Sequence, residues 1–160
     1  MSKPNRPAVE VQRSGRVPAP IERVWAVVSD AARAPDWFSF ADRTEVRSGS
    51  GLGEQRTQHG RWGAKRSEID QEVVEYDPPR VIAWKHTAER LNGKPAPSYA
   101  ASAVFRIELE PDGPDATVVR LRTLQQPRSA ATGFVMRWAG ARELARRMEE
   151  SLTRLLGAVD

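Results

Sequence analysis

Apolar and polar residues alternate most regularly between Ser98 and Glu110, which predicts a long strand with one buried face. That face would carry Tyr99, Ala101, Ala103, Phe105, Ile107 and Leu109. A turn rich in proline and glycine follows, and Thr117–Leu124 then alternates in the same way. Val81–Arg90 alternates as well, and its more apolar face holds Ile82, Trp84 and His86. Short turns between such segments favour antiparallel strands that bury one side of a sheet.

Helical spacing of apolar residues replaces alternation in two regions of the chain. Pro20–Ser29 has apolar residues three and four apart and begins with a proline, which predicts an amphipathic helix. Asp30 can cap a second short helix, Ala31–Trp37. Ser129–Gly157 predicts one long helix of roughly 40 Å at 1.5 Å per residue. A terminal helix of this kind can cover only part of a broad sheet, so we expect a cavity between the two.

The remaining strands are predicted at Ala8–Val17, Ala41–Ser48, Glu54–Gly60 and Lys65–Tyr76. The order is then one strand, two short helices, six strands and a long helix. This order predicts an α+β protein with a seven-stranded antiparallel sheet, one face of which is partly covered by the terminal helix. We expect residues 1–7 to be a flexible lead-in and residues 8–158 to form a single domain.

The hairpin predicted between residues 51 and 72 is unusual because both of its faces are polar. In its first strand, either Glu54, Arg56 and Gln58 or Gln55, Thr57 and His59 would face the interior. Either set would give the cavity a polar wall that suits water or a ligand with oxygen atoms. The alternative is an exposed edge hairpin with both faces in solvent.

Composition narrows the classes of function. Hydrophobic residues make up 39% of the chain, with a mean hydropathy of −0.58, which is low for a solid core and fits a hollow interior. The net charge of +4 is spread among alternating signs, so we expect no nucleic-acid partner. With no cysteine and two histidines, neither a metal site nor a cofactor is expected. No export signal or long apolar run is evident, so no transmembrane segment and a cytoplasmic location are expected.

Several stretches together carry a resemblance to a known family. They are VPAPIERVWAVVSDAARAPDWF, GLGEQRT, VVEYDPPRVIAWKH and VFRIELEPDGPDATVVRLRT, followed by the long final helix. Over about Val9–Leu156 the chain resembles the polyketide cyclase/dehydrase group of the START-like (SRPBCC) superfamily. The resemblance implies the helix-grip, or Bet v 1-like, fold: an antiparallel sheet wrapped around the terminal helix, with a ligand cavity between the two. Members of that superfamily include polyketide aromatase/cyclases, lipid and quinone carriers and chaperone activators, so membership alone does not define a function.

The implied cavity and the strand parity together predict a set of ligand-binding residues. They are Trp37, Phe38, Phe40, Arg56, Ile82, Trp84, His86, Tyr99, Ala101, Phe105, Phe134 and Trp138. These residues are mostly aromatic and suit a flat or elongated apolar ligand. The alternative for each aromatic residue is that it packs against its neighbours in a core.

Four residues are candidates for chemistry within the cavity. Arg56 and Arg66 could each hold a carboxylate, phosphate or enolate oxygen, and His86 or Tyr99 could move a proton. No catalytic triad, paired carboxylates or phosphate loop is present in the sequence.

Three functions remain open from the sequence. The first is a carrier or binding protein, monomeric or homodimeric, for a small hydrophobic ligand with oxygen functions, such as a polyketide, lipid or quinone. The second is a polyketide aromatase/cyclase or dehydratase acting on a ligand folded in the same cavity. The third is an interaction protein that uses a basic face of the last helix, comprising Arg142, Arg146, Arg147 and Arg154.

Overall fold

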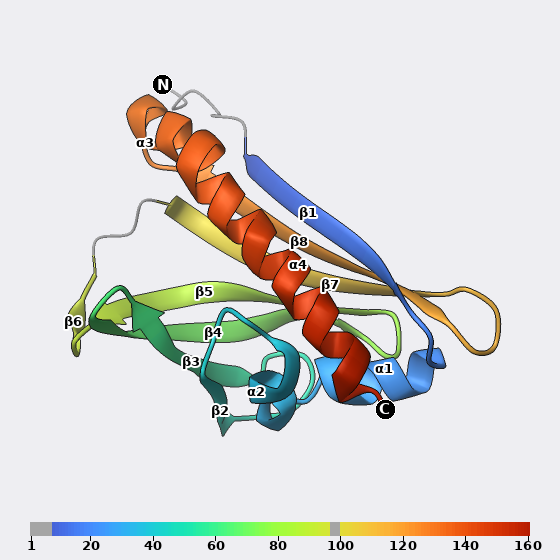
Figure 1. The fold of residues 1–160 in the computed structure, drawn as a ribbon. Helices are drawn as coiled ribbons and strands as arrows, with labels where there is room; N and C mark the ends of the chain where they lie inside the picture. Colours follow the sequence, from blue (N-terminus) through green and yellow to red (C-terminus); the bar gives the residue numbers. More distant parts are fainter. Residues whose placement is uncertain (1–7, 97–99) are drawn as a thin grey trace, which may run out of the picture.

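A bent antiparallel sheet wraps around a C-terminal helical segment in the computed structural model, which describes residues 8–96 and 100–160 (Figure 1). Its strands are β1 (Val9–Val17), β2 (Arg43–Ser48), β3 (Gln55–Trp62), β4 (Lys65–Asp77), β5 (Val81–Leu91), β6 (Lys94–Pro95), β7 (Ala100–Pro111) and β8 (Thr117–Pro127). The helices are α1 (Ile21–Val28), the 3₁₀ turn η1 (Ala31–Arg33), α2 (Ala34–Trp37), α3 (Ala130–Val135), the π-helical segment η2 (Met136–Gly140) and α4 (Ala141–Ala158).

The sheet has the order β1-β8-β7-β5-β4-β3-β2, and every pairing is antiparallel. Because β1 and β2 form opposite edges, α1, η1 and α2 carry the chain from one edge to the other. The predicted α+β helix-grip fold is therefore confirmed. The two-residue strand β6, which pairs only with the end of β5, adds a strand that the sequence did not predict.

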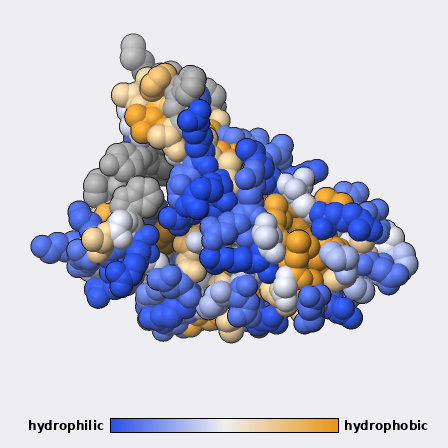
Figure 2. All heavy atoms as spheres, viewed as in Figure 1, coloured by the Kyte–Doolittle hydropathy of each residue, from blue (hydrophilic) through white to orange (hydrophobic). Residues whose placement is uncertain are grey.

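The predicted long terminal helix is present, with a change of helix type near its start. One turn of π-helix separates α3 from α4. α4 lies across the concave side of the sheet and packs against β1 and α2 (Figure 1). Its outward side is mostly hydrophilic in Figure 2, as expected for an amphipathic helix that covers one side of a core.

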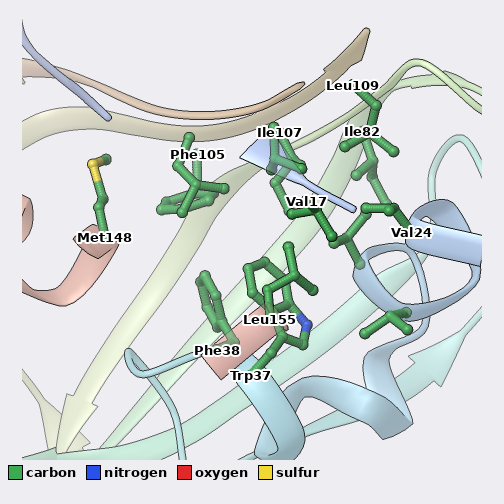
Figure 3. Packing of buried hydrophobic residues seen from close by; sticks show 14 of the residues in the cluster. Val17, Val24, Trp37, Phe38, Ile82, Phe105, Ile107, Leu109, Met148 and Leu155 are labelled. Carbon is green, nitrogen blue, oxygen red and sulfur yellow. The ribbon is translucent and has the colours of Figure 1, made fainter. Parts of the chain in front are cut away.

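The core lies where α1, α2 and α4 meet the concave face of the sheet (Figure 3). Its fully buried members include Val17, Val24, Ile82, Ile107, Leu121, Met148 and Leu155. On β7, Ala103, Phe105, Ile107 and Leu109 are all buried, which confirms the predicted inward face for these four residues.

The polar hairpin is not an edge of the sheet. β3 lies between β2 and β4, and Arg56, Thr57, Gln58 and Gln71 are all buried. The alternative of a hairpin wet on both faces is therefore wrong. Arg56 and Gln58 line an interior cavity described below, which confirms the first of the two possible registers.

The convex face of the sheet carries ion pairs that run across neighbouring strands. Arg106 on β7 reaches over the small side chain of Ala83 to Glu75 on β4, at 2.6 Å. Further along the face, Arg90 binds both carboxylate oxygens of Asp70, at 2.7 and 2.9 Å. These hydrogen bonds from Arg90, together with one from Thr57, lower the pKa of Asp70 to about 2 against the opposing effect of partial burial.

The lowered pKa of Asp70 predicts a pH-dependent contribution to stability. A carboxyl group with a depressed folded-state pKa stabilises the fold above its usual pKa of 3.8 and loses that effect as pH falls towards 2. Asp70→Asn should therefore lower the free energy of unfolding at pH 7 by about 1 kcal/mol, a value reduced for solvent screening. The difference from the wild type should disappear between pH 4 and pH 2 in urea titrations.

Asp112→Asn is the matched control, because it removes an exposed pair with Arg16. We expect this control to change stability by less than half as much. An Asp70→Asn difference that stayed constant down to pH 2 would contradict the assignment.

Candidate functional site

Five aromatic side chains gather between the sheet and α4 and are called here the aromatic cluster. They are Trp37, Phe38, Phe40, Trp84 and Phe105. Trp84 and Phe105 stack with ring centroids 5.2 Å apart and an interplanar angle of 12°. Phe38 meets both rings edge-on, at 5.9 and 5.2 Å, and points towards Phe105 in Figure 3. Such arrangements are the favoured geometries of aromatic pairs.

Strand register and one serine bring the aromatic cluster together. Trp84 on β5 and Phe105 on β7 are direct cross-strand partners, so their rings meet on the same face. Phe38 and Phe40 follow α2, and Ser39 between them fixes this segment to α4. The Ser39 backbone N–H donates to Ser151 Oγ at 3.0 Å, and Ser39 Oγ donates to the Arg147 carbonyl at 2.7 Å.

A row of buried polar side chains, Arg56, Gln58 and Gln71, faces the aromatic cluster and is called here the polar wall. Arg56 is only 5% exposed, and its guanidinium carbon lies 5.5 Å from the centre of the Trp84 ring system. Glu54 pairs with this guanidinium, and Nη2 donates to the Ser29 carbonyl at 3.2 Å. The positive charge is thus held in place by a carboxylate, a backbone oxygen and an aromatic face.

The two glutamines extend the polar wall along β3 and β4. Gln71 is the cross-strand partner of Arg56, and its amide nitrogen donates to Gln58 Oε1 at 2.9 Å. Gln58 Nε2 in turn donates to the Phe40 carbonyl at 3.4 Å. The polar wall is therefore connected by hydrogen bonds to the segment that carries Phe38 and Phe40.

The space left between the polar wall and the aromatic cluster is about 10 Å³, room for roughly one water molecule. Its lining consists of Val28, Asp30, Ala31, Ala34, Trp37, Phe38, Thr44, Arg56, Gln58, Gln71 and Trp84. The sequence predicted a cavity between the sheet and the terminal helix, and between the polar wall and the aromatic cluster only this small space is left. The five aromatic residues of the cluster, all of them predicted to line a cavity, pack on one another.

His86 lies on the same face of the sheet as the polar wall, since it is the cross-strand partner of Gln71. Its Nδ1 is buried and lies 3.4 Å from Glu89 Oε1, and no well-formed hydrogen bond reaches it from the described residues. The proximity of His86 lowers the pKa of Glu89 despite the opposing effect of burial, with a smaller contribution from Arg128.

Other predicted site residues lie elsewhere. Arg66 is two-thirds exposed and pairs with Glu68 on the same strand, so the structure does not bring it to the polar wall. Phe134 is 63% exposed on α3, where hydrophobic residues gather on the surface in Figure 2. Ile82 belongs to the core. Tyr99 lies outside the described residues, as do the side chains of Ala101 and Trp138.

Sequence reasoning missed Gln71 and Glu89. The signal for Gln71 was present, because it lies between Ile69 and Val73 at the spacing of one strand face. Glu89 faces inward only because a register shift near Thr87 changes the parity of β5. Within the described ranges, no three His, Cys, Asp or Glu side chains are grouped so as to hold a metal ion, and no helix is long and apolar enough to cross a bilayer.

One known protein family matches nearly the whole chain. The model of the family described as "Polyketide cyclase / dehydrase and lipid transport" matches residues 8–159. The chain belongs to this family. A search of curated proteins found no match.

Solved structures of other proteins share the fold. The Zhui aromatase/cyclase from Streptomyces sp. R1128 has 20% identity and a TM-score of 0.71, with 95% of this chain and 93% of that chain covered. A START superfamily protein from Mycobacterium smegmatis has 15% identity and a TM-score of 0.71, with 94% and 96% covered. A protein from Thermus thermophilus has 18% identity and a TM-score of 0.73, with 94% and 97% covered. At these identities the likeness establishes the fold alone.

The packing of Phe38 predicts a large stability cost for its removal. Phe38→Ala should lower the free energy of unfolding by about 3–4 kcal/mol, because it leaves a hole between the rings of Trp84 and Phe105. Urea denaturation measures this change. Leu52→Ala, at a position 67% exposed, is the control and should change stability by less than about 0.5 kcal/mol. A loss below about 1 kcal/mol for Phe38→Ala would contradict the packed aromatic cluster.

Proposed function

We propose that the protein binds a small hydrophobic molecule bearing oxygen atoms between the sheet and α4, and that it acts as a carrier or binding protein. The observation that carries this proposal is the polar wall, where Arg56, Gln58 and Gln71 are buried against aromatic rings. The family description, which includes lipid transport, supports the same class of ligand.

The chemistry of the polar wall suits ligand oxygens better than it suits a core. Buried amides that lose a partner cost about 1–3 kcal/mol each, so a protein that needed only stability would gain from aliphatic residues here. Gln58 and Gln71 can instead exchange their mutual hydrogen bond for bonds to a carbonyl or hydroxyl group. Trp84 and Phe105 offer flat apolar surfaces beside them for the body of the ligand.

Binding requires the interior to open, since the remaining space is about 10 Å³. Phe38 is the side chain whose displacement would free space next to both Trp84 and the polar wall. It belongs to the short segment between α2 and β2, not to the sheet. Movement of such a segment is a lower-cost route to an open cavity than movement of paired strands.

Paired probes test this proposal. Anthraquinone and anthracene have similar shapes, but only the quinone carries oxygens. The wild-type protein should bind anthraquinone about tenfold more tightly, corresponding to one or two hydrogen bonds, and the double variant Gln58→Leu/Gln71→Leu should lose that preference. Fluorescence titration measures both dissociation constants.

Gln55→Leu is the matched control, because Gln55 pairs with Glu72 on the opposite face of the same strands and should leave the preference intact. If neither anthraquinone nor anthracene bound, that result would contradict the proposed function. Equal affinity for both probes in the wild type would show that the polar wall does not recognise the oxygens of the ligand.

A second candidate function, catalysis of a cyclase or dehydratase type, is supported by His86. Its buried Nδ1 lies near Glu89 and on the face of the sheet that carries Gln71. A histidine held beside a carboxylate can take a proton from a carbon next to a ligand carbonyl. For the third candidate, an interaction protein, support is weaker because Arg146, Arg147 and Arg154 are paired with Glu143 and Glu150 on their own helix.

Proton abstraction by His86 has a direct readout. If the protein is an enzyme of this type, it should accelerate deuterium exchange at the central carbon of a bound cyclic β-diketone in D₂O, measured by proton NMR. His86→Gln should reduce that rate at least about 100-fold while changing the probe affinity less than about threefold. Exchange no faster than in buffer, or unchanged by the substitution, would leave the carrier function alone.

A further inference from the structure

A second cavity, called here the outer cleft, lies on the surface between α4, the end of β3 and the segment that follows α2. Its volume is about 190 Å³, much larger than the space in the interior. It is lined by Ser39, Phe40, Ala41, Asp42, Gly60, Arg61, Arg146, Arg147 and Glu150. The outer cleft is mainly polar, in contrast with the aromatic cluster.

Phe40 separates the outer cleft from the interior. It lines the cleft, and its ring packs against Phe38 and Phe105 with centroid distances of 5.0 and 5.4 Å. Its carbonyl accepts a hydrogen bond from Gln58, which lines the inner cavity. A molecule in the outer cleft therefore contacts the same short segment whose displacement would open the interior.

More arginines than carboxylates line the outer cleft, and within the part of the chain that the structure describes one of these arginines is unpaired. Arg146 and Arg147 share Glu143, while Arg146 and Glu150 are 3.6 Å apart, beyond a normal hydrogen bond. Arg61, on the opposite wall, is exposed and has no ion-pair partner among the described residues. Arg61 on β3 and Arg146 on α4 thus both line the outer cleft, and an arginine side chain can bind a carboxylate or phosphate through two of its N–H groups.

We propose that the outer cleft is the portal of the binding site and that it holds an anionic end of the ligand. The ligand class is then an amphiphilic anion, with a carboxylate or phosphate near Arg61 and Arg146 and an apolar body that extends past Phe40 to the aromatic cluster. This inference rests on the proposed function, because it requires the interior to accept the apolar body. Asp42 and Glu150 also line the outer cleft. Their carboxylates would repel an anionic group placed away from the arginines.

Two alternatives for the outer cleft predict different effects of ligand charge. If Asp42 and Glu150 dominated its field, a cationic ligand would bind best. If the cleft were only a surface depression, the charge of the ligand would not affect affinity. The three cases differ in the sign of the charge effect, which makes them separable with one set of probes.

The experiment compares neutral anthraquinone with its 2-carboxylate, its 2-methyl phosphate ester and its 2-methylammonium derivative, by fluorescence titration at low and high salt. In the wild type, at least one anion should bind about five- to tenfold more tightly than the neutral quinone, and the ammonium derivative more weakly. The better of the two anions distinguishes a carboxylate ligand from a phosphate ligand. The advantage should shrink as salt rises from about 20 to 300 mM.

Arg61→Gln should reduce the advantage of the anion to less than twofold and leave affinity for neutral anthraquinone unchanged. Arg23→Gln is the matched control, since Arg23 is exposed on α1 and does not line the cleft. Anthraquinone binding with no preference for an anion, or a preference unaffected by Arg61→Gln, would overturn the portal proposal while sparing the proposed function. Absence of binding by every probe would overturn both.

Discussion

The burial of the Arg56 guanidinium against Trp84 is the contact on which the interior of this protein depends. A charge removed from water must be compensated, and here Glu54, the Ser29 carbonyl and the indole face provide that compensation. Ser29 is the C-terminal cap of α1, so the same guanidinium connects the first helix to the middle of the sheet. Through the cross-strand pair with Gln71, it also sets where the polar part of the interior ends and the aromatic part begins.

This arrangement explains how a chain of low hydrophobicity can have a closed core. Large rings of the aromatic cluster fill the volume, and the polar wall satisfies most of its own hydrogen bonds. The segment from Phe38 to Phe40 is the joint between these two parts, since it carries two rings of the cluster and accepts a hydrogen bond from Gln58. Ser39 ties that segment to α4 by only a few hydrogen bonds. This segment lies outside the paired strands, so the proposed opening of the interior would not require the sheet to separate.

Much of the fold could be predicted from local patterns. Alternation identified the buried face of β7, and helical spacing identified α1 and the terminal helix. The scarcity of apolar residues between residues 51 and 72 indicated a polar interior surface, and Arg56 and Gln58 were among the residues considered for it. The sequence could not predict that Phe38 would close the space, because the same aromatic residues serve in pockets and in cores. Nor could it predict the position of Glu89, which depends on an irregular register between β4 and β5.

The outer cleft was also beyond sequence reasoning, since its walls come from three separate parts of the chain, around Phe40, Arg61 and Arg146. No local pattern connects these residues, and each is ordinary in its own segment. Their meeting follows from how α4 crosses the sheet and how the chain after α2 returns to the edge strand β2. Because a shared fold does not define a ligand, the proposal on ligand class rests on the residues of these walls and not on the fold.

The most direct test of the account is to locate a bound hydrophobic ligand by NMR, from intermolecular nuclear Overhauser effects between the protons of bound anthraquinone and assigned protein side chains. The account predicts contacts to the rings of Phe38, Trp84 and Phe105, which would place the ligand between the sheet and α4. Contacts confined to exposed apolar residues of α3, such as Phe134 and Val135, would contradict it and would mean that the interior is a closed core.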